Sequence, residues 1–102
     1  MLPEALMALI ESGRAPAILD VRTAAEFRRG HVPGAVHVPF WKVALAPLAA
    51  LPDPGGPVAV YCGHGPRARI AVAALRARGF SGAMLVAGHM ARWRRRGLPE
   101  ER

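Results

Sequence analysis

Short apolar runs alternate with helix-forming segments along this chain, and this alternation restricts its fold more than any other feature. Residues 17–21 (AILDV) and 58–61 (VAVY) have the mostly apolar character of strands buried on both faces. Residues 35–38 and 83–86 are expected to be two further short strands. Because helical segments separate them, the strands should run parallel. We therefore predict an α/β fold, a three-layer α/β/α sandwich around a small parallel sheet of four to five strands.

Local end signals mark two of the helices between these strands. Helices are expected over residues 2–11 and 66–78, since each starts near a proline and ends close to a glycine. In the second of these helices, we expect Ile70, Ala74 and Leu75 to line one apolar face.

Three further helical segments are expected. A capping box joins Thr23 and Glu26, so a short helix should follow. Residues 40–51 should form a loose helix that Pro47 bends or interrupts. Residues 89–96 should form a basic last helix.

Length and composition exclude several classes of protein. The 102 residues show no repeat or linker, so we expect one domain over residues 1–102. No stretch approaches the roughly 20 apolar residues of a membrane span, and the first residues lack the basic lead-in of a signal peptide. The net charge of +7 favours anionic partners of any kind. The single cysteine excludes an internal disulfide and fits a reducing compartment, so a cytoplasmic location is expected.

That cysteine stands in a loop suited to binding an anion. Cys62 directly follows a predicted strand, and a helix starts four residues later at Pro66. In open α/β sheets, ligands bind outside the carboxyl ends of the strands. Gly63 and Gly65 would let several backbone N–H groups turn toward one point, which the positive end of the helix also faces. Arg67 adds a cation that can bind an oxyanion through two hydrogen bonds.

Two interpretations of this cysteine are open. A lone cysteine is often a small buried apolar residue. The strand end, the glycines and the arginine favour instead a nucleophile whose thiolate is stabilised by N–H groups and positive charge. His64, inside the loop, could assist proton transfer or point to solvent. We expect Cys62 to be catalytic, and the substrate to be bound by Gly63, His64, Gly65, Pro66, Arg67 and Ala68.

Asp20 and Arg22 close the first buried strand at the same edge of the sheet as Cys62. The ordinary interpretation is an ion pair or a set of capping contacts that orders the loop ends. We expect such a supporting role, with Asp20 bracing loop backbone or Arg22. Glu26 is interpreted first as a capping residue, and any pairing with Arg22 or His31 as structural.

The other polar clusters carry weaker signals. His31, His37 and His89 are scattered and have no metal-ligand spacing with the single cysteine, so no metal is expected. The arginines of residues 92–96 surround Trp93, which the simplest interpretation buries beneath a solvated basic face. Nucleic-acid binding has little support, because only one aromatic residue is interleaved and no recognition motif is present. A docking surface for an acidic protein is a further alternative.

Three stretches, in the right order, resemble the signatures of single-domain rhodaneses. Residues 60–67 (VYCGHGPR) resemble the active-site loop, in which a strand ends in cysteine and arginine closes a six-residue loop. Residues 19–35 contain LDVR, EF and GHVPGA, similar to the N-terminal signature. Residues 88–99 contain GHMARW and GLP, similar to the C-terminal signature. The match covers roughly residues 18–99.

This resemblance implies the rhodanese-like fold and a thiosulfate sulfurtransferase activity. Cys62 would take a sulfane sulfur from thiosulfate or a persulfide donor, hold it as a persulfide and pass it to a thiol or to cyanide. An acidic sulfur-carrier protein is a possible partner. We expect no cofactor and no membrane partner.

Three positions depart from the family pattern. Gly63 stands where arginine is frequent, Ala68 where serine or threonine is common, and His89 where a second glycine is usual. The first departure removes a cation from the loop and the second a hydroxyl donor. They bear on donor preference and rate more than on the reaction itself.

Two other functions stay open at this point. One is a non-catalytic binding or sensing module on the same fold. The other is a cysteine-dependent phosphatase or arsenate reductase, whose loops place five residues between cysteine and arginine. This chain has four, residues 63–66, and the smaller cradle favours sulfur over phosphate.

Overall fold

The computed structural model describes all 102 residues and contains a four-stranded sheet in the order β2-β1-β3-β4. Its strands are β1 (Ala17–Asp20), β2 (Val36–His37), β3 (Val58–Tyr61) and β4 (Ala83–Leu85). β1 pairs in parallel with β2 and β3, and β3 pairs in parallel with β4. The predicted parallel sheet is confirmed, although β1, β2 and β4 are one or two residues shorter than expected.

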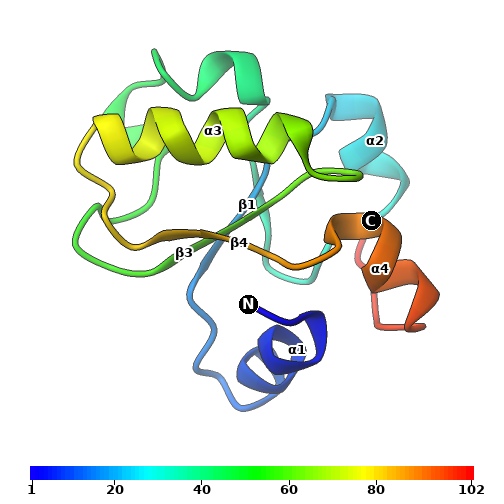
Figure 1. The fold of residues 1–102 in the computed structure, drawn as a ribbon. Helices are drawn as coiled ribbons and strands as arrows, with labels where there is room; N and C mark the ends of the chain where they lie inside the picture. The colour runs from blue at the N-terminus through cyan, green and yellow to red at the C-terminus, as the bar shows by residue number, and fades with distance from the viewer.

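Four α-helices lie around this sheet: α1 (Pro3–Glu11), α2 (Ala24–Arg29), α3 (Pro66–Ala77) and α4 (His89–Arg95). Figure 1 shows α3 along one face of the sheet and α1 beneath the other, where it contacts α4. None of these helices is long and apolar enough to cross a membrane. The layers are those of the predicted α/β sandwich.

Two apolar clusters separate the layers. Val60 of β3 packs with Leu75 of α3 in the cluster on the α3 side. Tyr61 packs with Trp93 of α4 in the cluster on the opposite side. Successive strand residues point to opposite faces of a sheet, so Cys62 again faces the α3 side, where it belongs to the first cluster. The alternation along β3 therefore places the thiol under the start of α3.

Residues 40–51 do not form the predicted loose helix. They contain two short 3₁₀ helices instead, η1 (Phe40–Lys42) and η2 (Leu48–Ala50). Pro47 has a ψ angle of 143°, which is extended backbone, and proline has no N–H to continue a helical ladder. Pro47 thus interrupts the segment, one of the two predicted outcomes, and directly precedes η2, whereas η1 has already ended at Lys42.

The buried face of α3 also differs from the expectation. Leu75 is buried as predicted, but Ile70 is 55% exposed and Ala74 is only partly buried. The helix turns Ala68 and Ala71 toward the sheet instead. Since these side chains are small, the first turns of α3 can pack close to the end of β3.

Candidate active site

Cys62 lies directly after β3, completely buried beneath the loop that leads into α3. The backbone N–H of Gly65 donates a hydrogen bond to its Sγ over 3.0 Å. Gly65 is the residue before the first turn of α3 and has a φ of 134°, a conformation that residues with a side chain rarely adopt. The glycine thus turns the chain so that its N–H faces the sulfur.

The loop backbone directs fewer N–H groups at the thiol than the sequence predicts. Gly65 alone supplies an N–H to Sγ, where several donors were expected. Gly63 does not have a positive φ, so the expectation that both glycines turn the loop backbone holds for Gly65 alone. A Cβ added at Gly63 would lie 3.1 Å from Nη2 of Arg67. Its small size therefore matters for the approach of the arginine, not for the turn.

Both backbone groups of Cys62 are held by the start of α4. The Cys62 N–H donates to Nδ1 of His89 over 3.2 Å, and the Cys62 carbonyl accepts from the Met90 N–H at 2.9 Å. The next carbonyl, that of Gly63, accepts from the Ala91 N–H at 3.1 Å. α4 therefore fixes the position from which the thiol side chain projects.

His89 is a member of this site that the sequence interpretation did not assign. It is buried, and it is the single residue other than glycine with a positive φ, at 53°. Burial lowers the pKa of the imidazole, and the charges of Arg69 and His64 lower it further. The ring is thus neutral near pH 7. Because Nδ1 accepts the Cys62 N–H, the ring proton is on Nε2, which faces Gly65.

Arg67 bridges the thiol and Glu26. Its Nη1 and Nη2 donate to Oε1 and Oε2 of Glu26 at 2.6 and 3.1 Å. These hydrogen bonds raise the pKa of Arg67, and Cys62 is near enough to contribute to the rise. The same hydrogen bonds lower the pKa of Glu26 to about 2. Both side chains are about 30% exposed. Because its pKa is so low, Glu26 is ionised next to the loop at any ordinary pH.

The capping box at the start of α2 is present as predicted. Thr23 Oγ1 accepts from the Glu26 N–H, and Glu26 Oε1 accepts from the Thr23 N–H. The sequence identified this cap but not the partner of its charge. Glu26 pairs with Arg67, 41 residues away, and not with Arg22 or His31.

Asp20 and Arg22 form the expected buried ion pair, at 2.7 Å between Oδ2 and Nη2. Asp20 also accepts from the Arg22 backbone N–H at 3.0 Å and from the Tyr61 hydroxyl at 2.6 Å. Burial, and then the charge of Asp20, raise the pKa of Tyr61, which stays protonated as a donor. Because Tyr61 precedes Cys62, this network holds the end of β3 on the face opposite the thiol.

The remaining predicted loop residues differ in exposure. His64 and Pro66 are exposed, whereas Ala68 is buried under α3. His64 makes no hydrogen bond to the thiol, but it is near enough to His89 to lower the pKa of that imidazole. No group of three or more His, Cys, Asp or Glu side chains is placed to hold a metal ion.

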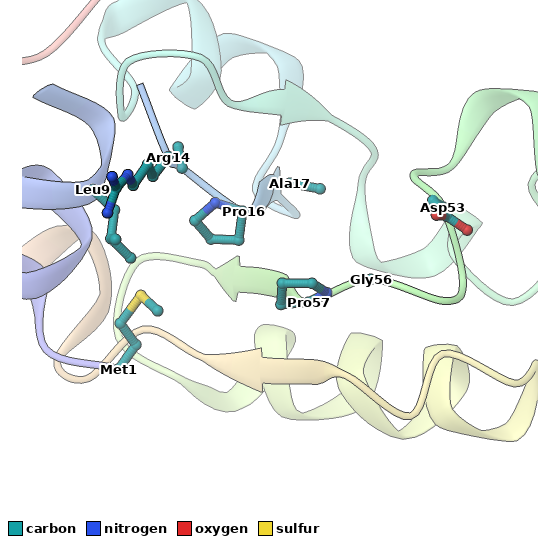
Figure 2. A pocket seen from close by; sticks show the side chains of 9 residues that line it. Met1, Leu9, Arg14, Pro16, Ala17, Asp53, Gly56 and Pro57 are labelled. Carbon is teal, nitrogen blue, oxygen red and sulfur yellow. The ribbon is translucent and has the colours of Figure 1, made fainter. Parts of the chain in front are cut away.

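The surface hollows of the molecule lie elsewhere. Figure 2 shows one of about 350 Å³ at the amino ends of β1 and β3, lined by Met1, Arg14 and Asp53 among others. Neither this hollow nor the two others includes any residue from 62 to 68. The thiol is therefore enclosed by its own loop rather than placed in a preformed cavity.

Comparison with known proteins decides the family. A family model described as the Rhodanese-like domain matches residues 2–96. The chain belongs to the rhodanese-like domain family. Thiosulfate sulfurtransferase GlpE of Pseudomonas savastanoi pv. phaseolicola is 36% identical over 92 residues, which are 90% of this chain and 83% of that protein.

Solved structures of rhodanese-like proteins agree with this assignment. The human single-domain sulfurtransferase TSTD1 has a TM-score of 0.81 at 27% identity, covering 93% of this chain and 94% of that one. The Alr3790 protein of Anabaena has a TM-score of 0.88 at 26% identity, covering 99% and 90%. The expected family and the expected class of activity, sulfur transfer, are confirmed by these relatives.

The two flanking rhodanese signatures have structural roles around the loop. In the N-terminal one, the Val32 N–H donates to the Tyr61 hydroxyl and the Gly30 carbonyl accepts from Arg22. In the C-terminal one, the buried Trp93 donates its Nε1–H to the Pro99 carbonyl at 2.8 Å. Both signatures thus support β3 and α4, the two elements that hold Cys62 in place.

Proposed function

We propose that this rhodanese-like protein transfers a sulfane sulfur through a persulfide on Cys62. The thiolate attacks the outer sulfur of thiosulfate, so that a new S–S bond forms to Cys62. The S–S bond of the donor breaks, and its electron pair leaves with sulfite. A persulfide donor would react in the same way and leave as a thiolate.

One observation carries this proposal: the 3.0 Å hydrogen bond from the Gly65 N–H to Sγ of Cys62, next to the Arg67 guanidinium. A preorganised N–H donor and a cation stabilise negative charge at the sulfur, first on the thiolate and then on the persulfide. Both groups are fixed by the backbone and by Glu26, so little reorganisation is needed during the reaction.

The second half of the reaction needs an acceptor from outside the chain. Cys62 is the single cysteine, so no other thiol of the protein can take the sulfur. A free thiol or cyanide would attack the outer sulfur of the persulfide and release the Cys62 thiolate. An acidic sulfur-carrier protein is a further candidate, since the net charge of +7 favours such a partner. This partner and a reducing cytoplasmic location stay predictions.

A phosphatase or arsenate reductase activity is the second candidate. Four residues separate Cys62 from Arg67, one fewer than in the loops of those enzymes, so the cradle is smaller. This loop length favours a sulfur atom over a phosphoryl group. A binding module without catalysis would keep the fold but would not need the thiol.

The test is sulfite release from thiosulfate with cyanide as acceptor, measured for the wild type and for Cys62→Ser. We expect turnover by the wild type and none by a Cys62→Ser protein whose thermal unfolding shows that it is folded. Turnover by Cys62→Ser would contradict the proposal. Hydrolysis of p-nitrophenyl phosphate faster than thiosulfate turnover would support the phosphatase instead.

A further inference from the structure

Arg67 is the one arginine in the loop from Cys62 to Ala68, and its guanidinium is already paired with the carboxylate of Glu26. Both terminal nitrogens of its guanidinium donate to Glu26, at 2.6 and 3.1 Å. Gly63 supplies no second cation, and His64 is exposed and not hydrogen-bonded to the thiol. An anionic donor that approaches the thiol therefore meets a cation whose charge Glu26 largely balances.

The position of Glu26 is fixed by the start of α2. Its Oε1 accepts from the backbone N–H and the hydroxyl of Thr23, each at 3.1 Å, as well as from Arg67. The two contacts with Thr23 hold the carboxylate beside the loop independently of Arg67. Arg67 lowers the pKa of Glu26 to about 2, so the carboxylate does not lose its charge by protonation.

We propose that Glu26 sets the donor preference of the Cys62 loop, so that a singly charged sulfane donor, such as an alkyl persulfide or a thiosulfonate, is preferred to the thiosulfate dianion. This inference rests on the proposed sulfur transfer through Cys62. Glu26 repels each negative charge of a donor bound near Arg67, and the repulsion is larger for a dianion. The residue acts on specificity through charge and does not take part in the chemistry.

Two donors that differ by one charge make the test direct. Thiosulfate and methanethiosulfonate both carry a terminal sulfur, but a methyl group replaces one anionic oxygen in the second. In each reaction the Cys62 thiolate bonds to the terminal sulfur, and the electron pair of the broken S–S bond leaves with sulfite or with methanesulfinate. With saturating cyanide, thiocyanate is the common product, so kcat and KM can be compared for the two donors at constant ionic strength.

The informative variant is Glu26→Gln, since glutamine also completes a capping box. It removes the negative charge, and its amide nitrogen can no longer accept the second hydrogen bond from Arg67. We expect the ratio of kcat/KM for thiosulfate to that for methanethiosulfonate to rise about tenfold, mainly through a lower KM for thiosulfate. Thr23→Ala is the matched control, because it weakens the same cap but keeps the carboxylate. Its ratio should stay at the wild-type value.

Gly63→Arg gives a second test that leaves Glu26 in place. A cation added to the loop should shift the ratio in the same direction. The position has no positive φ, and the added Cβ would meet only the flexible end of Arg67, at 3.1 Å from Nη2, which has to move slightly. This variant decides the matter if Glu26→Gln does not fold.

Several results would overturn the inference. One is an unchanged ratio of kcat/KM for the two donors in Glu26→Gln. If Glu26→Gln does not fold, an unchanged ratio in Gly63→Arg has the same meaning. Equal losses with both donors would mean that Glu26 only positions Arg67, and an equal shift in Thr23→Ala would mean that the order of α2 is responsible. Failure of the wild type to use either donor would instead contradict the proposed function itself.

Discussion

The backbone N–H of Cys62 donates a hydrogen bond to Nδ1 of His89 over 3.2 Å. This bond joins the end of β3 to the start of α4, and it requires an imidazole that is unprotonated at Nδ1. Protonation of His89 would place two donors face to face. The hydrogen bond that holds the buried side of the loop therefore depends on the charge state of His89, a histidine at a position where the family commonly has glycine.

We predict that stability depends on pH through His89. Burial, together with the charges of Arg69 and His64, holds the folded pKa of His89 below its ordinary value of 6.5. Its contribution to folding is complete above pH 6.5 and is lost as the pH falls through the lower folded value, because the unfolded chain then binds the extra proton. Thermal unfolding as a function of pH measures this loss.

His89→Asn is the comparison variant for this prediction. Asparagine tolerates a positive φ and offers a carbonyl oxygen to the Cys62 N–H, but it does not titrate. The variant should lose less stability than the wild type between neutral and mildly acidic pH. Identical pH dependence of the two proteins would show that His89 does not couple to folding, since the other three histidines are common to both.

The two loop glycines should respond differently to alanine. Gly65 has a φ of 134° and a Cβ there would lie 3.4 Å from Nε2 of His89. Gly65→Ala is expected to cost about 1–3 kcal/mol and to slow persulfide formation by at least about tenfold, since it strains the turn that aims the N–H at Cys62. Gly63→Ala should lose less of the rate, since it has no positive φ and its Cβ would meet only the flexible end of Arg67, at 3.1 Å. Equal rates for the two variants in a sulfite-release assay would contradict this account.

Removal of Asp20 should destabilise the protein strongly. Arg22 is 2% exposed, so Asp20→Ala leaves a buried guanidinium without its carboxylate. We expect a loss of about 3–5 kcal/mol in the free energy of unfolding, measured with urea. The double variant Asp20→Ala/Arg22→Met, which removes both charges, should recover part of this loss. A single variant that loses less than about 1 kcal/mol would show that the pair is not buried as described.

Glu26 should give the protein a second, acidic dependence on pH. Its pKa is lowered from 4.5 to about 2 by the hydrogen bonds from Arg67, with a further contribution from Thr23. The contribution to stability is present above pH 4.5 and is lost as the pH falls toward 2. Acid unfolding of Glu26→Gln should lack this component. Superimposable acid transitions for the wild type and the variant would refute the coupling.

Much of this structure follows from local sequence patterns. The apolar runs at β1 and β3 predict a buried parallel sheet, and the capping box between Thr23 and Glu26 correctly places the start of α2. The position of Cys62 after β3 and before Pro66 also follows from the sequence. Such features depend on residues that are close together in the chain, so that periodicity and end signals are enough to find them.

The features that sequence analysis missed depend on distant contacts. Glu26 meets Arg67 across 41 residues, and His89 meets Cys62 across 27. No local pattern encodes either pairing; the unusual residue at position 89 was the one available sign. Residues 40–51 differ for another reason: the sequence predicts an interruption or bend at Pro47, but it does not show that the helical segments on the two sides shrink to single 3₁₀ turns.

The most direct measurement is mass spectrometry of the protein after exposure to thiosulfate or to a persulfide donor. We predict a gain of one sulfur atom, located on the peptide that contains Cys62 and removed by cyanide or by an excess of thiol. Cys62→Ser should gain nothing under the same conditions. A wild-type protein that stays unmodified, or a Cys62→Ser protein that gains the same sulfur atom, would contradict the claim that this thiol carries the sulfur.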